Sequence, residues 1–155
     1  MPIKKIRNLP LLRSIFSFVE RRPLTLAWIV SLVATLGSLF YSEIAGYDPC
    51  RLCWYQRILM YPMAIILGIA TFKKDKLVWR YALPLSVIGG IIAAYHYGIQ
   101  LLANARPGFS DACTATGASC VSSEFWAFHY ITIPTMALTA FVVIFILMVL
   151  WKRKQ

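Results

Sequence analysis

The sequence predicts an all-α integral membrane protein, an antiparallel four-helix bundle with both termini in the cytoplasm. Hydrophobic residues make up 59% of the 155 residues and charged residues only 14%, whereas soluble domains carry about 25% charged residues. The apolar residues also come in four long runs rather than in narrow amphipathic stripes. Because so few charges cannot cover the surface of a soluble domain, the bilayer is the expected solvent of this chain.

Each apolar run is long enough to cross about 30 Å of hydrocarbon, which takes about 20 helical residues. We expect spans at about residues 24–44, 54–72, 77–102 and 131–151, with a long loop at 103–130. The first run far exceeds the roughly 7–15 apolar residues of a signal peptide core, so we expect it to be retained. Since the chain has no internal repeat and no long linker, residues 1–155 are predicted to form one domain.

The segment before the first span combines apolar residues at helical spacing with basic residues. Leu12, Ile15, Phe16 and Val19 recur in this way among Lys and Arg residues. Such a pattern is typical of a helix that lies on the inner leaflet of a membrane. We therefore expect a basic N-terminal interfacial helix in contact with membrane lipid, and a frayed basic tail is the alternative.

The basic residues predict the orientation of the chain. The formal net charge is +10, and thirteen of the sixteen Lys and Arg residues lie in three short segments. These residues are Lys4, Lys5, Arg7, Arg13, Arg21, Arg22, Lys73, Lys74, Lys76, Arg80, Lys152, Arg153 and Lys154. Four spans place all three segments on one side, which the positive-inside rule makes cytoplasmic. The clustering favours a topology signal over nucleic-acid binding, and we expect a monomer that binds no nucleic acid.

All four cysteines fall on the outer face under this topology. Cys50 and Cys53 open the second span, and Cys113 and Cys120 lie in the loop between the third and fourth spans. An even number of cysteines on the oxidising side predicts disulfides. Cys50 and Cys53 form a Cys-x-x-Cys motif at a helix N-terminus, where the helix dipole favours a thiolate. This motif therefore predicts a disulfide poised for exchange.

Two structural interpretations compete with disulfide exchange. The wider pair, Cys113 and Cys120, can act as a staple for its loop, but a static staple does not call for the strained small ring of the first pair. A four-cysteine zinc site is the second interpretation, because Cys-x-x-Cys is a common zinc spacing. Since the second pair is separated by six residues and the compartment is oxidising, we favour exchange and expect no metal site.

Arg57 is the most informative residue besides the cysteines. It lies inside the second apolar run, one helical turn after Cys53, where a charge is costly and is by default functional. Four residues on a helix correspond to about 6 Å of rise and nearly one turn, so the two side chains share a face. Snorkelling of the guanidinium toward the outer headgroups is the alternative interpretation.

The run PCRLCWYQR at residues 49–57, at the start of the second of four spans, resembles the signature of the disulfide bond formation protein B (DsbB) family. The order of spans and cysteine pairs is similar over most of the chain. The close spacing of the second cysteine pair, with six residues between Cys113 and Cys120, is most similar to the BdbC branch of Gram-positive bacteria. The same holds for the ITIP start of the last span, at residues 131–134. Gram-negative members have a longer second outer loop. They commonly carry an acid where this chain has Gln56, to which we assign no role.

This resemblance implies a thiol:quinone oxidoreductase of the bacterial cell membrane, with its redox cysteines on the extracytoplasmic face. A thioredoxin-like thiol oxidase of the DsbA or BdbD kind is then expected to attack Cys113. The released Cys120 attacks Cys50, and Cys53 is left as the thiolate that faces ubiquinone or menaquinone. These expectations follow from the family and not from composition or spacing.

Arg57 and His96 are the expected quinone-binding residues. Arg57 can reach the Cys53 sulfur or a quinone oxygen, and a fixed cation there would stabilise negative charge that develops on that oxygen. His96 lies deep in the third span, where a buried histidine with satisfied hydrogen bonds is the alternative.

Three rival classes remain open. A vitamin K epoxide reductase relative also has a membrane Cys-x-x-Cys, but that pair comes late in its chain, after the loop cysteines. A membrane scaffold or transporter subunit with two structural disulfides would need no free thiol at any stage. A haem-carrying electron conduit would have to pair His96 with His129, about 33 residues away at the outer interface.

Overall fold

The computed structural model describes residues 19, 22–105 and 132–155. Helix α3 (Pro23–Leu39) continues directly into a short π-helix, η1 (Phe40–Ile44). Three further long helices follow: α4 (Arg51–Lys73), α5 (Trp79–Ala105) and α6 (Ile133–Arg153). Because the described residues contain helices and no strand, the all-α prediction is confirmed.

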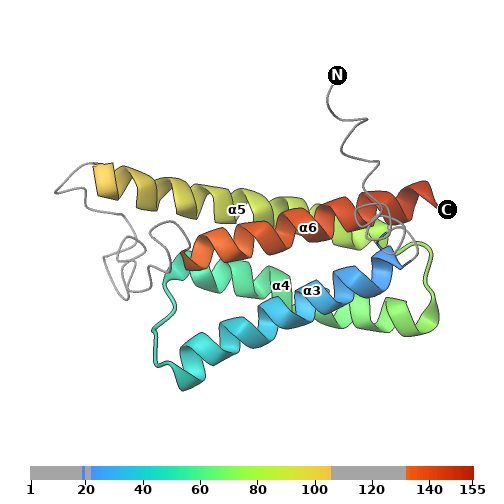
Figure 1. Ribbon diagram of the computed structural model, residues 1–155, viewed down its shortest axis with the longest axis horizontal. Coiled ribbons are helices and arrows are strands. Elements are labelled where there is room, and N and C mark those ends of the chain that lie inside the picture. The colour runs from blue at the N-terminus through green and yellow to red at the C-terminus, as the bar shows by residue number, and fades with distance from the viewer. Residues whose placement is uncertain (1–18, 20–21, 106–131) are drawn as a thin grey trace, which may run out of the picture.

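The helices form an elongated antiparallel bundle (Figure 1). Helix α3 packs against α4 and α6, and α5 packs against the same two helices. The start of α3, the α4–α5 turn and the end of α6 lie at one end of the bundle, and η1 and the start of α4 lie at the other. Apart from Val19, the predicted interfacial helix falls outside the described residues.

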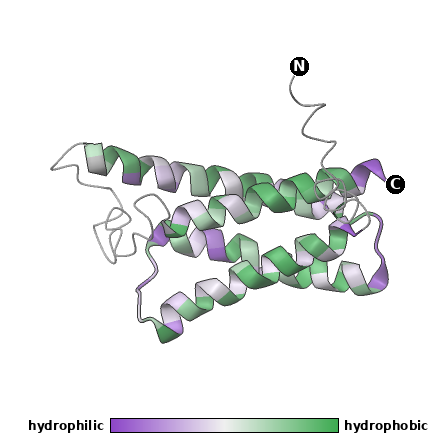
Figure 2. Cartoon of the chain, in the orientation of Figure 1, coloured by the Kyte–Doolittle hydropathy of each residue, from purple (hydrophilic) through white to green (hydrophobic). Residues whose placement is uncertain are grey.

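Four helices in the described part of the chain are long and apolar enough to cross a membrane. They comprise Pro23–Ile44, Arg51–Lys73, Trp79–Ala103 and Ile133–Arg153, so every predicted span boundary lies within three residues of an observed one. Their outward faces carry large apolar side chains, among them Ile44 (74% exposed) and Phe72 (76% exposed). Figure 2 shows this hydrophobic surface along the helices, with hydrophilic residues mostly near their ends. Such a surface suits a lipid environment.

The core of the bundle receives side chains from all four long helices. Its completely buried members include Ala27 of α3, Met63 of α4, Ala93 of α5 and Ile144 of α6. Ser86 is also buried, and its hydroxyl donates a hydrogen bond to the Leu83 carbonyl at 2.8 Å. This bond within the helix leaves no unpaired hydroxyl at the contact, so a small polar residue is tolerated in the core.

Helix α5 packs tightly against α6 at Gly89. A methyl group built at Gly89 would overlap the ring of Phe141, whereas one built at Gly90 would meet the Phe141 Cβ at an ordinary 3.8 Å. The spacing of small residues in α5 predicts close packing at Ser86, Gly90 and Ala94. In the structure Ala94 is exposed, so the contact face is rotated toward Gly89.

Replacing Gly89 with alanine is therefore expected to destabilise the bundle by about 1–3 kcal/mol, the usual cost of overpacking a filled core. The matched control is Gly90→Ala, which adds the same methyl group one residue away without a clash. The measurement is the thermal midpoint of each purified variant in detergent, determined from the loss of its monodisperse peak on heating. A Gly89→Ala midpoint equal to that of Gly90→Ala would contradict the close packing against Phe141.

Candidate active site

The start of α4 holds the Cys-x-x-Cys pair. Cys50 is the N-cap residue, with an extended backbone (φ −68°, ψ 169°), and the helix begins at Arg51. The Cys50 Sγ accepts a hydrogen bond from the backbone N–H of Cys53 at 3.4 Å. This bond satisfies one of the N–H groups that every helix start leaves unpaired. The cap explains why α4 begins three residues before the predicted position 54 and includes Cys53 in its first turn.

The two cysteines are adjacent thiols with different surroundings. Cys50 is buried and Cys53 is partly exposed, and the Cys50 Sγ donates a hydrogen bond to the Cys53 Sγ at 3.0 Å. This bond and burial raise the pKa of Cys50 from 9.0 to about 12, outweighing the opposite effect of His96. The thiolate expected from the helix dipole is therefore disfavoured at Cys50.

His96 reaches this pair from α5. Its side chain is 1% exposed, and its Nε2 lies 3.7 Å from the Cys50 Sγ. Its Nδ1 lies 3.2 Å from the Nε2 of Gln56 on α4. Because a carboxamide nitrogen only donates, Nδ1 is the acceptor in this arrangement and the proton of the neutral ring sits on Nε2, facing Cys50.

Gln56 is a site residue to which sequence reasoning assigned no role. It is buried at 6% exposure and connects α4 to His96 of α5. The available signal is a polar side chain three residues after Cys53, within an apolar run. Its partner lies 40 residues further along the chain, so the pairing becomes visible only once α4 packs on α5.

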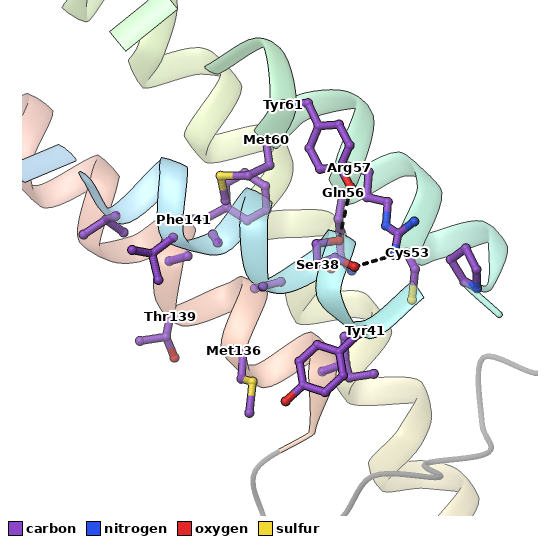
Figure 3. Close-up of a pocket in the computed structure, with 18 of the residues that line it drawn as sticks. Ser38, Tyr41, Cys53, Gln56, Arg57, Met60, Tyr61, Met136, Thr139 and Phe141 are labelled. Carbon is purple, nitrogen blue, oxygen red and sulfur yellow. Dashed lines mark hydrogen bonds between the residues drawn. The ribbon is translucent and has the colours of Figure 1, made fainter. Parts of the chain in front are cut away.

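A mainly apolar cavity of about 640 Å³ adjoins Cys53. It lies between α3, α4 and α6 (Figure 3), and Cys53, Gln56 and Arg57 line it from α4. Most of its remaining wall is apolar and includes Ile29, Val33, Met60, Met136, Ala140 and Phe141. Its volume falls within the roughly 300–1,000 Å³ of pockets that hold small organic ligands. The cavity can therefore accept an apolar ring next to the Cys53 sulfur.

Arg57 stands at this cavity and is anchored to α3. Its Nη2 donates a hydrogen bond to the Ser38 carbonyl at 3.0 Å, and its Cζ lies 5.5 Å from the centroid of the Trp54 ring. The Tyr61 hydroxyl donates to the Ser38 Oγ at 3.4 Å. Figure 3 shows both side chains directed toward Ser38. This anchoring supports a functional cation more than free snorkelling to the headgroups.

The structure thus brings Cys50, Cys53 and His96 together and places Cys53 and Arg57 on the wall of one cavity. His96 is not among the cavity-lining residues and instead lies against Cys50 and Gln56. The other predicted catalytic residues, Cys113 and Cys120, fall outside the described residues, as does His129. Among the described residues, the sulfur atoms of the pair and a His96 ring nitrogen could also hold a metal ion, since they lie within 4.8 Å of one another.

Comparisons with known proteins agree on one family. The family model for disulfide bond formation protein DsbB matches residues 20–151. The disulfide bond formation protein C of Bacillus subtilis is 49% identical over 131 residues, which cover 83% of this chain and 91% of that protein. A probable disulfide formation protein of Metapseudomonas resinovorans is 44% identical, covering 84% and 90%. Another, of Coxiella burnetii, is 38% identical, covering 81% and 84%. No solved structure matches the chain significantly.

Proposed function

Because the chain belongs to the DsbB family of multi-pass membrane proteins that form disulfides, we propose that it is a thiol:quinone oxidoreductase. It reoxidises a secreted thioredoxin-like thiol oxidase of the DsbA or BdbD kind and passes the electrons to ubiquinone or menaquinone. The relatives named for disulfide formation support the thiol half of this reaction. The cavity beside Cys53 supports the quinone half.

The observation that carries the proposal is the position of Cys53 between the Cys50 thiol and an apolar cavity. Its sulfur is 3.0 Å from that of Cys50, and the residue also lines the cavity together with Arg57. A sulfur in this position can exchange with a disulfide on one side and give up electrons on the other. The rival scaffold function gives no reason for a pair of adjacent thiols, one buried and one partly exposed, next to a cation and a cavity of about 640 Å³.

In the thiol half, each step breaks one S–S bond and forms another. A partner thiolate attacks Cys113, Cys120 leaves as a thiolate, and the partner's second thiol then displaces Cys113 and completes the partner's disulfide. Cys120 attacks Cys50, and Cys53 leaves as a thiolate. Cys113 finally displaces Cys50 from Cys120, which restores the loop disulfide. The partner has lost two electrons, and the pair Cys50 and Cys53 has gained them.

In the quinone half, oxidation of the Cys50 and Cys53 thiols releases two electrons and two protons. A quinone in the cavity takes up both and becomes a quinol. Cys53 gives up electrons at the cavity wall, while the Cys50 sulfur stays 3.0 Å away, in position to close the disulfide. The fixed positive charge of Arg57 stabilises negative charge on an oxygen in the cavity.

For His96, the distances favour a role at Cys50 over the predicted quinone contact. Its Nε2–H faces the Cys50 Sγ at 3.7 Å, and Gln56 holds the ring in that tautomer. A hydrogen bond from this nitrogen stabilises negative charge on Cys50 when Cys113 displaces it from Cys120. Gln56 acts through His96 and is therefore a positioning residue.

We place the cysteine end of the bundle on the extracytoplasmic face of the bacterial cell membrane, with both termini in the cytoplasm. The start of α3, the α4–α5 turn, the start of α5 and the end of α6 lie at the end opposite the start of α4. These segments carry the exposed basic residues Arg22, Lys74, Arg80 and Lys152, in agreement with the positive-inside rule. The proposed unit is a monomer surrounded by membrane lipid.

The decisive test is anaerobic turnover of the purified protein with a reduced thioredoxin-like oxidase and either ubiquinone or menaquinone. We expect one quinol for each partner disulfide formed, because both reactions transfer two electrons. The matched inactive variant is Cys50→Ala, which cannot close the disulfide with Cys53. If neither quinone is consumed while the partner remains reduced, the scaffold interpretation is favoured and the proposal fails.

A further inference from the structure

Three ligand atoms converge at the outer end of the bundle. The sulfurs of Cys50 and Cys53 are 3.0 Å apart, and the His96 Nε2 lies 3.7 Å from the Cys50 sulfur. In a tetrahedral zinc site, with bonds of about 2.3 Å to sulfur and 2.0–2.1 Å to nitrogen, neighbouring ligand atoms lie about 3.5–3.8 Å apart. All three ligand atoms lie within 4.8 Å of one another, so they reach zinc geometry with side-chain movements of about 1 Å.

We propose that Cys50, Cys53 and His96 form a redox-gated binding site for a thiophilic divalent cation such as Zn²⁺. The site exists when the two cysteines are a dithiol and disappears when they form a disulfide, because a disulfide offers no thiolate ligands. Three protein ligands leave the fourth position for water, and the partly exposed Cys53 provides access from the adjoining cavity. This site differs from the four-cysteine zinc site that the sequence disfavours, because it needs neither Cys113 nor Cys120.

Gln56 provides the outer support that metal-bound histidines usually have. A histidine that binds a metal through one nitrogen commonly donates the N–H of its other nitrogen to a fixed acceptor. Gln56 already lies 3.2 Å from the His96 Nδ1. Turning its carboxamide by 180° exchanges the NH₂ group for the carbonyl oxygen, which accepts from Nδ1–H and leaves the Nε2 lone pair facing the sulfurs. The same side chain therefore suits both the metal-free and the metal-bound ring.

The charge balance of the site favours a divalent ion. Two thiolates and a neutral imidazole around Zn²⁺ give a complex with no net charge, which suits a site where Cys50 and His96 are 5% and 1% exposed. Binding replaces two thiol protons with the metal and transfers no electrons. Because Cys53 would be a ligand, bound Zn²⁺ would hold the pair reduced and keep its electrons from the cavity.

The test uses the chain with Cys113→Ala and Cys120→Ala, so that the remaining thiols belong to the proposed site. The protein carries no polyhistidine tag and is studied in detergent without oxygen, partner or quinone. Zn²⁺ is titrated against a chromophoric chelator. We expect one Zn²⁺ per reduced chain, release of about two protons per Zn²⁺, and no comparable binding after oxidation of Cys50 and Cys53.

Two variants and one spectroscopic measurement identify the ligands. His96→Phe removes a ligand and Gln56→Leu removes its support, and the second change is expected to weaken binding about 10- to 100-fold. X-ray absorption of the zinc-loaded chain with Cys113→Ala and Cys120→Ala should show two sulfurs and one imidazole as zinc ligands. Equal binding by the oxidised chain, unchanged affinity in His96→Phe, or a zinc shell without imidazole would each overturn the site. X-ray absorption and redox dependence are both measured on the chain that keeps His96 and Gln56. They therefore test the site even where His96→Phe or Gln56→Leu misfolds. A negative result leaves the proposed quinone reaction intact.

Discussion

Replacing Cys53 with alanine is expected to lower sustained quinone reduction by on the order of 10³-fold or more, because the lost group is the proposed electron donor. Of the two cysteines that the structure describes, Cys53 is the one that lines the cavity, and its sulfur lies 3.0 Å from the Cys50 sulfur. Cys50 cannot substitute for it, since Cys50 is buried and does not line the cavity. Quinone absorbance under anaerobic turnover conditions measures the loss.

The same variant should retain a single round of thiol oxidation. This variant keeps the proposed disulfide between Cys113 and Cys120, so one equivalent of partner should be oxidised per chain before the reaction stops. Quantifying partner thiols after rapid mixing gives this amplitude. Continued quinone reduction by Cys53→Ala would contradict the assigned electron path, and the absence of the single round would favour a structural role for the loop disulfide.

The second large effect is expected for Arg57→Met, which removes the positive charge at the cavity while keeping a similar length of side chain. The guanidinium is held by the Ser38 carbonyl at 3.0 Å and lines the cavity. Without it, negative charge on a quinone oxygen loses its fixed counter-charge. We expect slower quinone reduction, or a higher Michaelis constant for quinone, by about tenfold or more, which corresponds to about 1.4 kcal/mol.

The effect should be confined to the quinone step. Exchange between Cys120 and Cys50 should persist in Arg57→Met, as followed by trapping of the disulfides with an alkylating agent. Arg57→Lys retains a charge but loses the planar fork, so an intermediate defect is expected. The matched control is Arg51→Met on the same helix, because Arg51 does not line the cavity. Quinone kinetics of Arg57→Met that match the parent over a full concentration series would favour the snorkelling interpretation.

Much of the fold could be predicted because hydrophobic length is a local property of the sequence. The observed spans differ from the predicted ones by at most three residues, and the largest difference, at the start of α4, comes from the Cys50 cap. A cap depends on backbone angles and on one sulfur-to-amide hydrogen bond, which hydropathy does not encode. The rotation of α5 toward Gly89 likewise depends on how the Phe141 ring fits.

The candidate site was predictable where its residues belong to one helical turn or motif. Cys53 and Arg57 are four residues apart, so helical geometry alone suggests a common face, and both line the cavity. The link from Gln56 to His96 joins different helices and needs their packing to be known. The Ser38 carbonyl that holds Arg57 is a backbone atom, so no residue type identifies it in advance.

The hydrogen bond between Gln56 and His96 also has a consequence for how the helices assemble in the bilayer. Helices inserted separately into lipid can slide or rotate against one another, because apolar surfaces pack in many similar ways. A slip of α4 on α5 would leave two buried polar side chains without each other, at a cost of about 1–3 kcal/mol for each unsatisfied group. At 3.2 Å, the paired arrangement singles out one register of α4 against α5. That register is also the one that sets His96 beside Cys50, so correct assembly and a complete redox site are selected by the same bond.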